Sequence, residues 1–261
     1  MSAPDFSNIL ADSNCYIKQL ENSRIGLSKA LVYLLVKARS EYEWPYGTGP
    51  AASQRIIFDH EKDIAHLLNG LTPAGAKKII EMVSRWGGNN QRAIDIIANA
   101  ESKVQILMAN TITDLADRKL LEGTLDTLSS MPGLRLVMAS KVYRFCCPEK
   151  GAAVDRHSSY FFNSLLIRDK QKRVKQTTKF KREWSNGKHT SSRLAIYQRQ
   201  SQAINIKMYL YSYLPLLERI SKILNENGIS YHCKATDMQR FWRPCDVEMA
   251  AYLWWAQNGP R

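Results

Sequence analysis

The sequence predicts an all-α protein. Apolar residues recur at intervals of three and four along most of the chain, as in amphipathic helices, and no segment alternates convincingly like a half-buried strand. Hydrophobic residues make up 44% of the composition and aromatic residues 10%, values typical of a folded globular protein. The 261 residues suffice for one large domain or two small ones, and we expect a single helical unit over 1–261, built as one body or as two packed subdomains.

Helical periodicity predicts the elements in chain order. Short segments rich in Gly, Pro and Asn, at 44–50 and 87–90, separate the earlier helices. Acidic residues in the first turn, Asp246 and Glu248, open the last helix, and for them a helix-start role and a catalytic role both stay open. The predicted helices cover 25–38, 61–68, 73–86, 92–100, 104–110, 134–147, 194–220 and 246–256, with one more after Asp155.

The charge of the chain is concentrated in one segment. The formal net charge is +13, and the segment 168–199 contains eleven Lys or Arg against two acidic residues, an excess of nine. Aromatic residues lie among the basic ones, and the polar first part of the segment is typical of an exposed loop. The segment is either a solvated face or a surface that contacts phosphates, and its share of the charge favours phosphate contacts.

The chain shows no sign of secretion, membrane insertion or metal binding. Its five cysteines include no C-x-x-C pair, so we expect free thiols and no metal site. The longest apolar runs are about seven residues, such as 250–256, whereas a membrane span needs about 20. The N-terminus lacks a basic stretch followed by an apolar one. We therefore expect a cytoplasmic protein associated with the nucleoid.

Lys141 is the first candidate catalytic residue. In the helix predicted at 134–147, which Pro148 ends, Lys141 falls inside the apolar stripe formed by Leu134, Met138, Val142 and Phe145. A lysine there either extends its amine from the rim of the core into solvent or loses its hydration. A desolvated lysine is in part a free amine at neutral pH, the form needed for nucleophilic attack and Schiff-base formation.

Asp155 is the second candidate catalytic residue. It follows the loop 148–154 and directly precedes an apolar helical run, which is the position of an N-cap. A capping role alone is enough to explain why an aspartate is found at this position. The N-terminus of a helix also favours the ionised carboxylate, which stabilises positive charge on a deoxyribose as its base departs. The two roles are compatible.

These residues together resemble a known superfamily. A Pro132-Gly133 turn is followed by Lys141 on a helix and then, after a short loop, by Asp155-Arg156-His157. The order of these features is similar to that in the helix-hairpin-helix DNA glycosylases. The segments 85–88, 193–197 and 242–250 resemble the bacterial branch that acts on 8-oxoguanine, so the likeness is scattered over 42–250. The turn departs from the family's Gly-x-Gly form because no second glycine follows Gly133, and the basic segment 168–199 is the candidate for the missing phosphate contacts.

The resemblance implies a helix-hairpin-helix glycosylase fold and a DNA N-glycosylase activity on a nucleotide flipped out of the duplex. Lys141 would attack the anomeric carbon and expel the base, with an associated abasic-site lyase activity, while Asp155 would stabilise the positive sugar. No metal or organic cofactor is implied. The partner would be double-stranded DNA containing a damaged or modified base; no membrane partner is expected, and we expect a monomer.

Further residues are expected to contact the DNA and the flipped base. Besides 168–199 as a whole, the DNA-contacting candidates are Arg156, His157, Lys179, Lys181, Arg182 and Arg193. An aromatic cluster, Tyr42, Trp44 and Tyr46, either sandwiches the base or covers the core.

Two kinds of substrate are open: an oxidised purine, which means repair, or a modified base of foreign DNA, which means antiviral defence. The alternative function is a DNA-binding module that has the glycosylase fold without catalysis.

Overall fold

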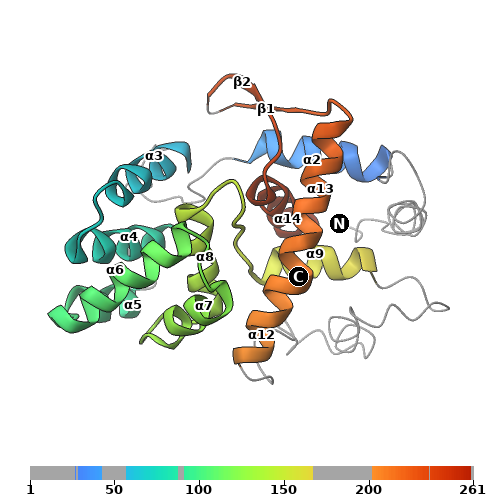
Figure 1. Cartoon of the computed structure of the whole chain (residues 1–261). Coiled ribbons are helices and arrows are strands. Elements are labelled where there is room, and N and C mark those ends of the chain that lie inside the picture. Colours follow the sequence, from blue (N-terminus) through green and yellow to red (C-terminus); the bar gives the residue numbers. More distant parts are fainter. Residues whose placement is uncertain are drawn as a thin grey trace. The chain divides into compact units, whose positions relative to one another are not determined.

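The computed structural model describes residues 27, 29–42, 57–87, 91–166, 202–234 and 236–259, and these are mostly helical (Figure 1). The chain forms two compact units. The first comprises Met1–Tyr42, Asp155–Ser201 and Tyr211–Arg261, and the second comprises Glu43–Val154 and Gln202–Leu210. Lys141 therefore belongs to the second unit and Asp155 to the first.

The second unit is built entirely of helices within its described part. Helix α4 packs against α3, α5, α6 and α8, and its inner face, which includes Ile79, Ile80 and Val83, is fully buried. Thr72 caps α4 by accepting a 3.1 Å hydrogen bond from Gly75 N, and Pro73 occupies its first turn. The helices are α3 (Ile57–Leu68), α4 (Pro73–Trp86), α5 (Gln91–Ala98), α6 (Ser102–Ala116), α7 (Leu121–Ser130), α8 (Leu136–Cys146) and α12 (Gln202–Met208).

The first unit is organised around its last helix. Helix α14 packs against α2, α9 and α13, and every residue from Pro244 to Ala251 is buried. Apolar residues lie on all sides of this helix, interrupted near its start by Asp246 and Glu248, and such a distribution suits a central position. The elements are α2 (Lys29–Glu41), α9 (Arg156–Leu166), α13 (Leu214–Glu226), the strands β1 (Tyr231–Cys233) and β2 (Met238–Arg240), and α14 (Pro244–Asn258).

The structure confirms a mostly helical protein and corrects three details. Strands β1 and β2 form an antiparallel hairpin in which Tyr231 pairs with Arg240, and three-residue strands are too short to produce a recognisable alternation. Helix α7 was not predicted, because Gly123 and several Thr and Ser residues weaken its pattern. The helix predicted at 194–220 is described from Gln202 and contains a π-helical segment, Tyr209–Tyr213, before α13.

Candidate functional site

Helix α8 holds Lys141 in the interior of the second unit. The helix follows a turn in which Leu134 N donates to Met131 O (3.0 Å) and Gly133 has a φ of +83°, a backbone conformation that favours glycine. The four apolar stripe residues predicted for this helix are buried, and α8 contacts α3, α4, α6 and α7. Lys141 itself is half-buried, so it lies at the edge of the stripe rather than deep inside it.

The amine of Lys141 has defined neighbours at the end of α4. Lys141 Nζ donates a 2.8 Å hydrogen bond to Gly87 O and lies 5.4 Å from the centre of the Trp86 ring. Gly87 leaves room for this arrangement, since a Cβ there would lie 3.0 Å from Lys141 Cδ and 3.2 Å from Nζ. The lysine side chain is thus packed along the end of α4 rather than extended into solvent.

A buried arginine beside Lys141 was missed by the sequence analysis. Arg144 is fully buried and forms a 2.6 Å ion pair with Glu61 of α3. Its guanidinium lies 4.2 Å from the centre of the Phe145 ring and 5.8 Å from that of Trp86. The sequence feature that could have identified Arg144 is its spacing from Lys141, because residues three positions apart lie on the same side of a helix.

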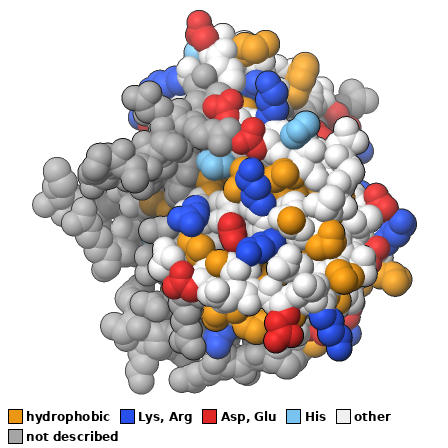
Figure 2. Space-filling view, turned by 90° about the vertical axis from the view of Figure 1, so that its left-hand side faces the viewer, with side chains coloured by type: hydrophobic (Ala, Val, Ile, Leu, Met, Phe, Trp, Pro, Cys, Tyr) orange, Lys and Arg blue, Asp and Glu red, His pale blue; other side chains and the backbone are white. Residues whose placement is uncertain are grey.

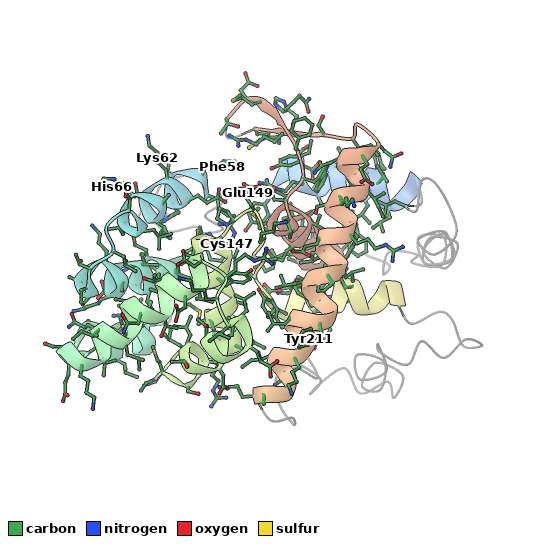
Figure 3. All side chains as sticks on the ribbon, in the orientation of Figure 1. Phe58, Lys62, His66, Cys147, Glu149 and Tyr211 are labelled. Atoms are coloured by element: carbon green, nitrogen blue, oxygen red, sulfur yellow. The ribbon has the colours of Figure 1, made fainter. Side chains whose placement is uncertain are left out.

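The loop after α8 is fastened back onto that helix. The loop begins at Cys147, and Glu149 follows two positions later; both residues are labelled in Figure 3. Gly151 lies against the α8 backbone, where a Cβ would come within 2.7 Å of Tyr143 O. Val154 N donates a 3.0 Å hydrogen bond to Ser140 Oγ, and the Tyr209 hydroxyl donates to Ala152 O. These contacts fix the position of the loop as far as Val154, which is the last residue of the Glu43–Val154 segment of the second unit.

The two cysteines at the end of α8 are poor candidates for a nucleophile. Burial raises the pKa of the Cys146 thiol to about 12, and burial also raises the pKa of Cys147 above its ordinary value. Both are free thiols, as are Cys233 and Cys245. Because the thiolate is the reactive form, these raised pKa values disfavour cysteine chemistry here.

In the first unit, Asp155 forms a reciprocal cap with Ser158 at the start of α9. Asp155 Oδ1 accepts hydrogen bonds from Ser158 N (2.9 Å) and Ser158 Oγ (3.1 Å), while Asp155 N donates to Ser158 Oγ (3.3 Å). This is the predicted N-cap. The second oxygen, Oδ2, has no hydrogen-bond partner among the described residues, and the side chain is half-buried. Capping therefore leaves one carboxylate oxygen available.

The other predicted site residues have different fates. Arg156 is the first residue of α9, and His157 is half-buried with its ring edge-on to Tyr252 at 5.2 Å. Tyr42 is buried after α2, with the Arg39 guanidinium 5.6 Å from its ring centre, which fits a cover over the core. The remaining candidates lie outside the described residues: Trp44, Tyr46, Lys179, Lys181, Arg182, Arg193 and the rest of the segment 168–199.

Asp246 holds a buried ionic cluster. Its carboxylate accepts hydrogen bonds from Arg39 (2.9 and 3.0 Å), from Arg243 Nε (2.9 Å) and from the Tyr231 hydroxyl (2.9 Å). Burial alone would raise the pKa of Asp246, but the two guanidinium groups outweigh it and hold that pKa well below its usual range. The surrounding partners and complete burial make Asp246 a structural residue rather than a catalytic one, and Glu248 is buried as well.

The described residues contain neither a cluster of metal ligands nor a helix that could span a membrane. No group of three His, Cys, Asp or Glu in the part of the chain that the structure describes is arranged to hold a metal ion. Within the same residues, no helix combines the length and the apolar character that crossing a membrane requires.

Comparison with known proteins finds no match among family models, curated proteins or solved structures.

Proposed function

We propose that the protein is a DNA glycosylase in which Lys141 is the nucleophile and Asp155 the electrostatic partner. The observation that carries the proposal is the position of the Lys141 amine, which is half-buried and held between Gly87 O and the Trp86 ring. A packed, oriented amine reaches a reactive geometry at a lower entropic cost than a mobile surface lysine. The environment of Asp155 supports the same proposal, because its cap uses Oδ1 and leaves Oδ2 available.

The proposed reaction begins with a nucleotide flipped out of the duplex. The amine of Lys141 in its neutral form attacks the anomeric carbon, and the N-glycosidic bond breaks with its electron pair leaving on the base, which takes up a proton. The attached amine then loses a proton, its lone pair forms the C=N bond as the C1′–O4′ bond breaks, and the ring oxygen keeps that electron pair and takes up a proton, which leaves a protonated Schiff base. The Asp155 carboxylate stabilises the positive charge that develops on the sugar during bond cleavage.

The charge distribution supports double-stranded DNA as the partner. On the face shown in Figure 2, basic and acidic side chains are interspersed rather than gathered by sign. The chain's excess positive charge lies instead largely in 168–199. A separate basic segment of this kind suits sequence-independent contact with phosphates. We propose cytoplasmic action on DNA, with either an oxidised purine or a modified base of foreign DNA as the substrate.

A panel of duplexes tests the proposal and separates the two substrates. The panel contains 8-oxoguanine, other oxidised purines and bulky modified pyrimidines of the kind found in viral DNA, and free base is measured after incubation with the protein. Release from the oxidised purines indicates repair, and release from the modified pyrimidines alone indicates defence. If the protein binds these duplexes but releases no base from any of them, the catalytically inactive DNA-binding module replaces the glycosylase.

Borohydride trapping tests the role of Lys141. Reduction during turnover converts the Schiff base into a stable protein–DNA adduct, so the wild-type protein is expected to form one and Lys141→Gln to form none while still binding DNA. Lys62→Gln is the matched control, since Lys62 is an exposed lysine of the same unit. Base release at a near-normal rate by Lys141→Gln would mean that water, activated by Asp155, is the nucleophile.

A further inference from the structure

A chain of hydrogen bonds leads from a buried tyrosine to the candidate catalytic carboxylate within the first unit. The Tyr213 hydroxyl donates a 3.0 Å hydrogen bond to Ser158 Oγ, and Ser158 Oγ lies 3.1 Å from Asp155 Oδ1. Tyr213 is 3% exposed and Ser158 is completely buried. The chain therefore runs through the interior of the unit and ends at a half-buried carboxylate.

Counting donors and acceptors sets the direction of the Ser158 proton. A serine hydroxyl has two lone pairs and one proton. Ser158 Oγ accepts from the Tyr213 hydroxyl and from Asp155 N (3.3 Å), so both lone pairs are used. The single proton then points to Asp155, where Oδ1 at 3.1 Å is a closer acceptor than the carbonyl oxygen at 3.5 Å. With Tyr213 in place, Ser158 is a donor to the carboxylate.

A local departure from the α-helix accompanies this contact. Tyr213 is the last residue of the π-helical segment Tyr209–Tyr213. Such segments are rare in proteins overall, and those that occur are often found at functional sites. The Tyr213 ring also packs edge-on against Phe162 of α9 at 5.8 Å, which restricts its orientation. Tyr211, which is labelled in Figure 3, lies two positions earlier in the segment. Its exposed fraction is 67%. The buried tyrosine that ends the segment is the one that reaches Ser158.

We propose that Tyr213 and Ser158 are positioning residues for Asp155. Together they fix the rotamer of the carboxylate, so that Oδ2 is presented in one orientation to the sugar. This inference rests on the proposed glycosylase function. A cap alone does not require Tyr213, because the hydrogen bond from Ser158 N to Asp155 Oδ1 is by itself the N-cap interaction.

Kinetics of Tyr213→Phe on a duplex that the wild-type protein cleaves test the inference. Loss of one buried hydrogen bond is worth roughly 1 kcal/mol, so we expect kcat to fall about fivefold to tenfold with KM nearly unchanged. Tyr231→Phe is the matched control: it removes another buried tyrosine hydroxyl bond in the same unit, to Asp246, and should leave kcat and KM near their wild-type values.

A double-mutant cycle separates positioning from general stability. If Tyr213 acts through Ser158, then adding Tyr213→Phe to Ser158→Ala should change kcat little further, whereas two independent structural losses would multiply. A wild-type kcat in Tyr213→Phe, a change in KM alone, or full multiplication of the two effects overturns the inference while the glycosylase stands. Absence of base release by the wild-type protein overturns both.

Discussion

The two carboxylate oxygens of Asp155 have different surroundings. Oδ1 accepts two hydrogen bonds from Ser158 and closes the first turn of α9. Oδ2 has no hydrogen-bond partner among the residues described, so it is the oxygen that our proposal turns toward the sugar. The same residue serves the helix and the proposed chemistry because a carboxylate has two acceptors and a cap requires one.

Asp155→Asn separates these roles. Asparagine caps helices as well as aspartate, so the free energy of unfolding should change by only a few tenths of a kcal/mol. The amide carries no charge to offset a positive sugar, and base release should fall by at least about a hundredfold. Single-turnover base release, DNA affinity and thermal melting together measure these effects. Parallel losses of affinity, activity and melting temperature would identify Asp155 as purely structural.

At the scale of elements, the buried cluster around Asp246 joins three parts of the first unit. Arg39 comes from α2, Tyr231 from β1, and Asp246 from the first turn of α14. Arg39 also lies 4.5 Å from the centre of the Tyr231 ring. Buried charges need such complete pairing, because an isolated charge in the interior costs several kcal/mol. The cluster fixes how these elements pack, independently of any catalytic role.

Removal of the Asp246 charge is expected to destabilise the first unit strongly. Asp246→Asn leaves Arg39 buried without its counter-charge, which typically costs about 3–5 kcal/mol. Urea unfolding at neutral pH measures this loss. Asp237→Asn is the control, because Asp237 belongs to the same unit but its side chain is 95% exposed. A loss below about 1 kcal/mol for Asp246→Asn would show that the cluster contributes little.

The same carboxylate predicts a pH dependence with a definite sign. The pKa of Asp246 is lower in the folded protein than the ordinary aspartate value of about 4 in the unfolded chain. Its stabilising contribution is therefore fully present above about pH 4 and is lost as the pH falls toward the folded pKa. Wild-type stability should decline more steeply below pH 4 than that of Asp246→Asn. Equal slopes in the two proteins would contradict this assignment.

For the molecule as a whole, the distribution of charge matters more than its total. Of a net charge of +13, nine come from 168–199, and the face in Figure 2 carries both signs. Binding driven by phosphate contacts releases condensed counterions, so affinity should fall steeply as salt rises. The basic segment, rather than the helical units, is then expected to supply most of the salt dependence.

A triple variant tests this expectation. Neutralising Lys179, Lys181 and Arg182 should reduce the slope of log affinity against log salt by up to about three units, because each lost phosphate contact removes about one. The matched control neutralises three exposed basic residues of the second unit, Lys62, Lys78 and Arg85, which removes the same formal charge. An unchanged slope in the first variant would show that the basic segment is a solvated face.

Local patterns in the sequence were enough for most helices and for the cap. The periodicity at 73–86 and the residues Thr72 and Pro73 define α4 because helix capping and amphipathicity act over a few neighbouring positions. Asp155 was predicted as an N-cap for the same reason, and the structure confirms it. Helix α7 and the short hairpin were missed, since their segments have weak propensity or too few residues to show a period.

Tertiary structure alone decided which distant residues meet. Arg39 and Asp246 are 207 positions apart, and Lys141 and Gly87 are 54 apart, so no local pattern links them. The sequence placed Lys141 on an apolar stripe, but its half-buried position depends on where the end of α4 packs against α8. Likewise, Asp246 has the sequence features of a helix-start residue, and only the packing of α2 and β1 onto α14 surrounds it with partners. Side-chain periodicity reports one helix at a time, whereas burial and charge pairing depend on what the other elements bring to it.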